Sequence, residues 1–468
     1  MAQLKSLPDE LLLDIALRLQ PPDLKDLALT ARQFRDIPQE ALHTSISLRT
    51  HYQSLPELLR TLVKRPDLAK KVPSLQITGY RGPQHVYRSA VGYDDSWDQV
   101  VTHAIKSTHS WPIDQMKWAS RVKDGDLYAC IGLLLVLTDQ LQNLTFCSGD
   151  NQDFMTPPSL SLTFPGIAER HAVTAPGTLL LPHLRRLSVA WGEMDRSWST
   201  FPKLLHLELD CTGPIAWDKE PVILLHGITT LTLHRPILYE YQAANTQDLS
   251  PFFQRLPALR SLHLCFTNWI EHYNNMSGGI GFSYGYYEYD NLYYATYNRE
   301  RICYPGQGFT SSIIIDPLIP ASHLLEELDL KCSDTGDSKQ IDYLRPSRSL
   351  QRFTLIKRLS IPQSVLINST PYECSPLHPF EALPPNVEYL NVADPTTAVI
   401  EWISGVLDDR SKLRSLKRIS LDFDNDPKQR VKDYKEAGVQ IFGRLLEAGI
   451  SVHFENVRSV CLEACCKE

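Results

Sequence analysis

Three neighbouring copies of a short apolar motif are followed by reactive side chains, at Asp210, His234 and Cys265. A carboxylate, an imidazole and a thiol are the groups from which enzymes build an activated nucleophile or a metal site. If the three copies are adjacent parallel strands, about 4.8 Å apart, these residues form a row. Side chains on a flat parallel sheet do not converge, and the sequence identifies no oxyanion donors. We therefore interpret the row as part of a recognition surface, and we expect no catalytic centre, no metal and no cofactor.

A second pattern, Gly-Phe-Ser-Tyr-Gly at residues 281–285, matches the G-x-S-x-G nucleophile elbow of hydrolases. That elbow requires a strand-to-helix turn in an α/β-hydrolase sheet, and no apolar strand precedes it here. Nine of the twenty tyrosines lie between residues 272 and 304, among Gly and Asn. This composition predicts a surface insertion at about residues 267–316, either a Tyr-based recognition loop or disordered filler.

Composition excludes several classes of protein. The net charge is −7 and its signs are interspersed, so there is no basic footprint for nucleic acid. The longest apolar run, residues 131–137, is far shorter than the roughly 20 residues that span a membrane. Charges and a proline stand where a secretory signal would begin, and the ten cysteines form no disulfide framework. We expect a cytoplasmic or nuclear protein with neither nucleic acid nor membrane as a partner.

An apolar–variable–apolar pattern returns along most of the chain, usually with Leu, Ile or Val three residues before it. Its copies begin at Leu75, Leu144, Leu187, Leu207, Leu231, Leu262, Leu328, Leu359, Leu390 and Ile419. The steps of 20 and 24 residues after Leu187 fit the period of leucine-rich repeats, while two steps exceed 60 and must contain insertions or degenerate repeats. Plausible helices at 127–140, 248–255, 399–407 and 427–448 lie between copies, which predicts parallel strands with right-handed crossovers.

These features predict the fold class α/β, as a solenoid similar to leucine-rich repeats with a curved parallel sheet. The alternative, a doubly wound enzyme domain, requires a Gly-rich strand-to-helix turn and continuously apolar central strands, which the sequence lacks. Because side chains alternate along a strand, one set faces the core: Leu207, Leu209, Leu231, Leu233, Leu262 and Leu264. The other set faces the concave surface and supplies the substrate-binding candidates His206, Glu208, Asp210, His234 and His263. Its carboxylates favour a partner segment with Lys or Arg.

The first fifty residues have helical periodicity instead. Ser6 and Asp9 have capping-box spacing, and Pro8 suits a first helical turn. Leu11, Leu12, Ile15 and Leu19 share one quadrant of the helical wheel, while Leu13 and Leu17 lie opposite. Pro21 begins a second helix, and Pro38 begins a third that ends at residues 46–48. So small a unit buries only one of its apolar faces by itself, and the other needs the rest of the chain or a partner.

This region resembles the F-box in the order and spacing of four short segments. They are Leu7-Pro8-Asp9-Glu10-Leu11-Leu12, Asp23-Leu24, Leu27-Ala28-Leu29-Thr30 and Arg32-Gln33-Phe34-Arg35. Proteins of that family dock the motif on the Skp adaptor of cullin–RING (SCF) ubiquitin ligases. The resemblance implies that the adaptor-binding residues are Leu7, Pro8, Leu11, Leu12, Ile15, Leu19, Leu24 and Leu27. Phe34 stands where the family usually has Trp. The later repeats are similar to the irregular leucine-rich domains that often follow an F-box.

The predicted domains are an F-box at 1–48, a leucine-rich-repeat-like solenoid at 49–456 and a flexible tail at 457–468. The tail contains Cys461, Cys465 and Cys466, for which we expect free thiols. The resemblance implies a non-catalytic substrate receptor of the ubiquitin conjugation pathway, with the Skp adaptor, cullin through that adaptor, and an unknown protein substrate as partners. The alternative is a protein-binding scaffold that uses the F-box only to bind the adaptor. We also expect Leu11, Leu12 and Ile15 to be exposed in the free chain.

Overall fold

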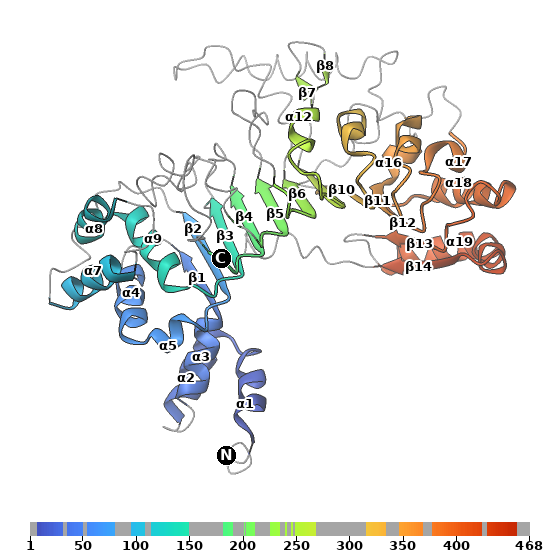
Figure 1. The fold of residues 1–468 in the computed structure, drawn as a ribbon. Coiled ribbons are helices and arrows are strands. Elements are labelled where there is room, and N and C mark those ends of the chain that lie inside the picture. The colour runs from blue at the N-terminus through green and yellow to red at the C-terminus, as the bar shows by residue number, and fades with distance from the viewer. Residues whose placement is uncertain are drawn as a thin grey trace, which may run out of the picture. The chain divides into compact units, whose positions relative to one another are not determined.

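The fold was taken from a computed structural model of the whole chain (Figure 1). It describes residues 7–30, 35–49, 54–79, 95–107, 114–148, 181–190, 201, 203–210, 225–234, 239–240, 245–246, 249–267, 315–333, 346–367, 377–423 and 428–455. The Gly-Phe-Ser-Tyr-Gly pattern at 281–285, most of the predicted insertion around it, Phe34 and the tail at 457–468 lie outside these residues. The chain divides into two compact units, residues 1–209 and 210–468.

The first unit begins with three helices: α1 (Asp9–Ala16), α2 (Pro21–Thr30) and α3 (Asp36–Thr44). Its strands are β1 (Ser45–Arg49), β2 (Ser74–Gly79), β3 (Asn143–Ser148), β4 (Arg186–Ala190) and β5 (His206–Asp210). The helices between strands are α4 (Ser54–Lys64), α5 (Pro66–Ala69), α7 (Asp95–Ser107), α8 (Gln115–Lys123) and α9 (Leu127–Leu137). Helices α4, α7, α8 and α9 pack together beside the strands (Figure 1).

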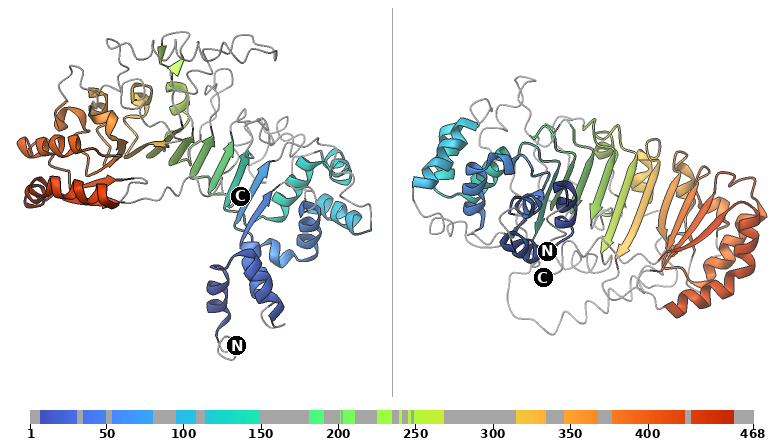
Figure 2. Two further views of the ribbon diagram at one scale, coloured as in Figure 1. Left: turned by 180° about the vertical axis from the view of Figure 1, so that it is seen from behind. Right: turned by 90° about the horizontal axis from the view of Figure 1, so that it is seen from below.

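The second unit has strands β6 (Thr230–His234), β9 (Ser261–Thr267), β10 (Glu327–Ser333), β11 (Arg358–Pro362), β12 (Tyr389–Ala393), β13 (Arg418–Asp422) and β14 (Ser451–Glu455). Its helices are α12 (Ser250–Phe253), α16 (Gln363–Leu366), α17 (Pro379–Ala382), α18 (Thr397–Asp408) and α19 (Lys428–Glu447), with 3-10 turns η6 (Asp316–Ala321) and η8 (Arg348–Arg352). A small antiparallel pair, β7 (Tyr239–Glu240) and β8 (Asn245–Thr246), stands apart from the main sheet. Helices α18 and α19, coloured orange to red, cover one face of the last strands (Figure 2).

The twelve main strands form a parallel sheet in chain order, which confirms the α/β class and the parallel strands predicted from sequence. In the second unit Leu231 pairs with Leu262, and Leu233 with Leu264. All four are fully buried, so they stack as predicted, and Leu207 and Leu209 are buried in β5. This stacking follows from the period-two alternation of the motif, which turns every second side chain toward the helices.

A repeated hydrogen bond marks the start of the strands in both units. The backbone N–H groups of Gln142 and Asn143 both donate to the carbonyl of Pro73, one repeat earlier. In the second unit the N–H groups of Lys357 and Arg358 donate in the same way to Glu326. Each repeat therefore fixes the register of the next by the same backbone contact, although the loops between them differ greatly in length.

Two predicted boundaries are wrong. The third helix ends at Thr44, and residues 45–49 form strand β1, so the predicted domain boundary at residue 48 falls inside a strand. Ile46 and Leu48 alternate with serines, and both pair with apolar residues of β2, which favours the strand over another helical turn. Helices α4 and α5 are separated at Arg65, because Pro66 begins a new helix.

Candidate functional site

Helix α1 has apolar side chains on two sides. Ala16 packs with Leu24 and Ala41 in a small cluster to which Leu13 and Leu19 also contribute. Helix α1 begins at Asp9 with Pro8 as its N-cap and no side-chain capping bond, and the expected capping residue Ser6 lies outside the described residues. The cluster holds one side of α1 against α2 and α3, and leaves the other side for a different contact.

That other side carries Leu11 and Ile15, which are one helical turn apart. Leu11 is 52% exposed and Ile15 is 39% exposed, and the neighbouring Pro8 is also exposed. Leu17, just after α1, and Leu29 on α2 are further exposed apolar residues, Leu29 at 75%. Only Leu11 and Ile15 are neighbours on the same side of α1, so this pair is the candidate contact, whereas scattered single exposures need no explanation.

The eight predicted adaptor-binding residues fall into three groups. Pro8, Leu11 and Ile15 are exposed, Leu7, Leu19 and Leu27 are half-buried, and Leu12 and Leu24 are buried. The prediction that Leu12 is exposed is therefore wrong: it is 7% exposed, because it lies one turn before Ala16 on the inward side of α1. Sequence reasoning did not select Leu17 or Leu29, although both are leucines within the motif region.

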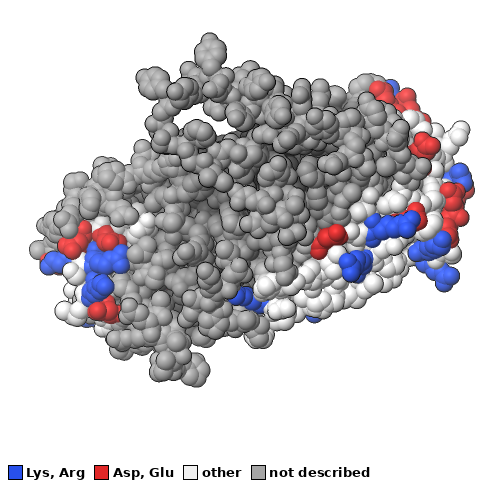
Figure 3. Space-filling view, turned by 90° about the horizontal axis from the view of Figure 1, so that it is seen from above, with Lys and Arg blue, Asp and Glu red and all other residues white. Residues whose placement is uncertain are grey.

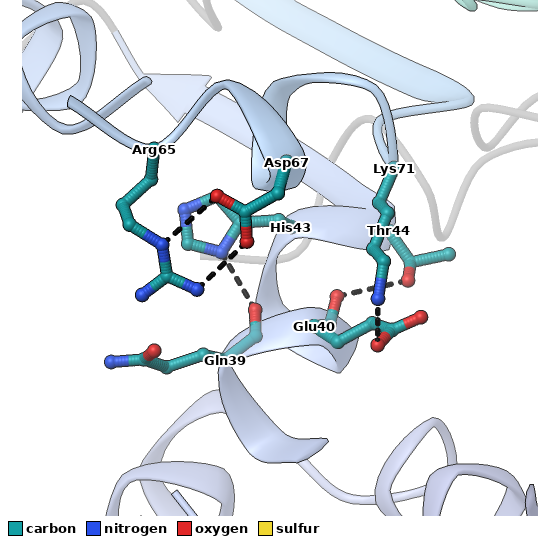
Figure 4. Close-up of polar contacts among 7 residues, drawn as sticks. All are labelled: Gln39, Glu40, His43, Thr44, Arg65, Asp67 and Lys71. Carbon is teal, nitrogen blue, oxygen red and sulfur yellow. Dashed lines mark hydrogen bonds and ion pairs between the residues drawn. The ribbon is translucent and has the colours of Figure 1, made fainter. Parts of the chain in front are cut away.

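The three helices are tied to the repeats that follow. Helix α3 continues directly into β1, and Glu40 of α3 forms an ion pair with Lys71, which lies just after α5 (Figure 4). The hydroxyl of Thr44 donates to the backbone carbonyl of Glu40 (3.0 Å), which holds the last turn of α3. Arg65 and Asp67 form a two-contact ion pair beside this junction (3.0 and 2.8 Å). The three helices are thus attached through α3 to the first strands.

Three substrate-binding candidates, His206, Glu208 and Asp210, lie on β5. His206 is exposed, and Glu208 is half-buried with its Oε2 atom 3.1 Å from the guanidinium of Arg186 on β4. The side chain of Asp210 lies outside the described residues. Because Arg186 already neutralises Glu208 in part, this carboxylate attracts a basic partner segment less strongly than the sequence suggests.

Two further candidates are His234 on β6 and His263 on β9. The register places His234 beside Cys265, as the predicted row requires, while its third member Asp210 is not described at the side chain. Within the described ranges, no three His, Cys, Asp or Glu side chains come together as a metal site. The register thus places His234 and Cys265 side by side on neighbouring strands.

His263 stands in a network that the sequence did not reveal. The register aligns it with Asp329 of β10, and its Nδ1 donates to Asp329 Oδ2 at 3.2 Å. Its Nε2 lies 2.9 Å from the hydroxyl of Ser261, which donates to Glu327 at 3.0 Å. Burial alone would raise the pKa of Asp329, but hydrogen bonds from His263 and Ser360 and the charge of Lys331 lower it. Asp329 is therefore an ionised, nearly buried carboxylate between two strands.

Ser261, His263 and Asp329 have the connectivity of a nucleophile, base and acid. The expectation that side chains on this sheet do not converge is thus wrong locally, because residues two apart on one strand meet a partner in register on the next. The Ser261 hydroxyl also donates to Glu327, and strands β9 and β10 are hydrogen-bonded to each other through their backbones. These contacts join β9 to β10, and we interpret the network as a cross-strand clamp.

Charge on the described surface is mixed. Among the described residues visible in Figure 3, Lys and Arg side chains lie next to Asp and Glu. In the part of the chain that the structure covers, no helix is both long and apolar enough to cross a membrane.

Comparisons with known proteins add no relatives. A scan of the sequence against models of protein families found no match, and a search of curated proteins found no similar sequence.

Proposed function

We propose that this chain is the substrate-recognition subunit of an SCF-type cullin–RING ubiquitin ligase. In this proposal α1 to α3 form an F-box that binds the Skp adaptor, and the repeats that follow hold a protein substrate. The motif at residues 7–35 supports the proposal by its resemblance to the F-box, and the parallel repeat sheet supports it as a surface suited to proteins.

One observation carries the proposal. Leu11 and Ile15 stay exposed on α1 although Ala16 on the same helix is fully buried. Full burial of an exposed Leu or Ile contributes about 1.5–3 kcal/mol, and because Leu11 and Ile15 are about half exposed, each would contribute roughly half of that in a partner interface. Pro8 and Leu29, both exposed, extend the apolar area that a partner covers.

The proposed chain has no chemistry of its own. It acts by proximity, raising the effective concentration of a substrate lysine near the conjugating enzyme that the cullin carries. The repeat sheet supplies positioned polar groups at little entropic cost, because strands are rigid. Of the candidates, His206 and Glu208 belong to the first unit, whereas His234 and His263 belong to the second.

Affinity capture tests the proposal, with the proteasome inhibited so that substrates persist. The full chain is compared with a form that begins at Ser45, since β1 begins there and the repeats stay whole. We expect the full chain to capture adaptor, cullin and ubiquitinated proteins, and the shortened form to lose adaptor and cullin. Capture of the adaptor without cullin would favour the scaffold alternative, and equal capture by both forms would refute the F-box assignment.

A further inference from the structure

Strands β11, β12 and β13 begin with Arg358, Tyr389 and Arg418, and the sheet register aligns these three residues in one row. They lie on the face opposite the core, because the next residue of each strand is buried. Tyr389 is 40% exposed, and both arginine side chains reach solvent. With strands about 4.8 Å apart, the row is roughly 10 Å long, which suits a short segment of a partner chain.

The two arginines differ in what they contact. The guanidinium of Arg418 is fixed by Glu455 (2.6 Å) and by the hydroxyl of Ser420 (3.2 Å). Arg358 makes no ion pair or side-chain hydrogen bond within the described residues. Its guanidinium carbon lies 5.7 Å from the ring centroid of Tyr389. Arg358 is therefore oriented by an aromatic ring while its donor fork stays open to a ligand.

The other charges at this edge of the sheet are arranged in pairs. Lys357 pairs with Glu326 (3.3 Å), and Lys417 pairs with Glu388 (2.5 Å). The hydrogen bond from Lys417 holds the pKa of Glu388 below its usual range, so this pair stays ionised and self-neutralised. Within the described residues Arg358 forms no ion pair of its own, although its charge also helps to lower the pKa of Glu388.

We propose that Arg358 and Tyr389 form the recognition site for an acidic segment of a partner protein. The carboxylate of an Asp or Glu side chain takes the open guanidinium of Arg358 in a two-contact pair, and an adjacent apolar side chain lies on Tyr389. Charge complementarity selects this ligand over a basic segment. The site adds a class of partner segment to the proposed function. Only the identification of that partner as the ligase substrate rests on the proposed function.

A protein segment fits this site better than nucleic acid does. A continuous row of phosphates needs several free cations along the strands, but Lys357, Lys417 and Arg418 are already paired with glutamates at this edge. The chain as a whole has a net charge of −7, which also opposes a polyanion. A peptide can place one carboxylate at Arg358 and keep neutral side chains beside the glutamates.

Fluorescence anisotropy with the full chain tests this site. The probes are three short labelled peptides in which Phe recurs among Glu, Lys or Gln, with a single-stranded oligonucleotide as competitor. We expect only the Glu peptide to bind, and we expect Arg358→Glu to weaken its affinity about tenfold or more. Tyr389→Ala should weaken binding, whereas Tyr389→Phe retains the ring and should not. The matched control is Arg352→Glu, the same charge change on η8, away from the sheet.

Thermal melting shows whether Arg358→Glu is folded, and Arg358→Gln provides a milder second variant. Equal binding of the Glu and Lys peptides would overturn the inference. Unchanged binding of the Glu peptide in both Arg358 variants would also overturn it, as would an equally large loss in Arg352→Glu. The same holds if the oligonucleotide displaces the labelled peptide at a lower concentration than unlabelled peptide does. Adaptor binding is measured separately on the same variants: its absence from the parent chain refutes the proposed function, and peptide binding alone decides the site.

Discussion

The three N-terminal helices and the repeat sheet use apolar residues in opposite ways. In the helices only a few small or branched side chains, Ala16, Leu24 and Ala41, form a buried cluster, while Leu11 and Leu29 face solvent. In the sheet, Leu231, Leu233, Leu262 and Leu264 are all fully buried, and polar residues occupy the exposed positions between them. The sheet thus completes its own core, whereas the helices leave apolar surface exposed, which the proposed function assigns to the adaptor.

The largest expected effect is the loss of a sheet leucine. Leu231→Ala leaves a cavity between β6 and β9, and we expect it to lower the free energy of unfolding by about 2–5 kcal/mol. The matched control is Thr232→Ala, on the solvent side of the same strand, for which we expect a change within about 0.5 kcal/mol. Denaturant unfolding measures both. Equal effects of the two substitutions would remove the contrast between the core and exposed faces of the sheet.

The His263–Asp329 contact gives the next largest effect. Asp329→Asn removes the charged acceptor of a nearly buried hydrogen bond, and we expect it to cost about 1–3 kcal/mol at neutral pH. Because the folded pKa of Asp329 lies below its unfolded value near 4, the unfolded chain binds this proton first as pH falls.

The stability that Asp329 contributes should therefore be fully present above about pH 4 and be lost as pH falls through the folded pKa. Denaturation measured at several acidic pH values checks this, with Asp329→Asn lacking that part of the pH dependence. The same acid sensitivity in both proteins would show that Asp329 is not the group responsible.

Two glycines of α19 provide a smaller, matched comparison within the repeats. A Cβ at Gly438 would lie 2.2 Å from the ring of Phe442, which packs against Phe454, whereas nothing lies within 4 Å of a Cβ at Gly443. Gly443→Ala should stabilise the protein by about 0.5–1 kcal/mol through helix propensity. Gly438→Ala should displace Phe442 and destabilise. Thermal unfolding that ranks the two variants in the reverse order would contradict this packing of the last helix.

The smallest effect belongs to the exposed ion pair of Lys417 and Glu388. Both side chains are in solvent contact, so screening by water and salt offsets their attraction. Replacing both by glutamine should leave the melting temperature unchanged at physiological ionic strength. A clear fall in melting temperature would mean that this exposed ion pair contributes to stability, contrary to the expectation that the buried leucines dominate.

The sheet was the part of the fold most accessible to sequence reasoning, because a period of two in Leu-x-Leu fixes which side chains face the core. The end of α3 was missed since Ser45 to Leu48 is too short for its period to stand out. The Ser261–His263–Asp329 network was missed for another reason: 66 residues separate His263 and Asp329, and only the register of β9 with β10 brings them together.

The helical surface was predicted in part. The wheel grouped Leu11 and Leu12 in one quadrant, but a quadrant does not say where the boundary between buried and exposed falls. In the structure Leu12 is buried and Leu11 is exposed, so the boundary falls between these two neighbours. Which side of α1 is buried depends on the position of α3, which carries Ala41 of the cluster. No local pattern in α1 encodes that position.

Binding of a purified Skp-type adaptor to the full chain tests the central contrast most directly. Leu11→Asp with Ile15→Asp places two charges on the exposed side of α1, and Val439→Asp with Leu446→Asp does the same on exposed positions of α19. We expect the first pair to abolish adaptor binding and the second to leave it unchanged, with both variants melting close to the parent chain. Adaptor affinity that is unchanged in the α1 variant, or absent from the parent chain, would contradict the account.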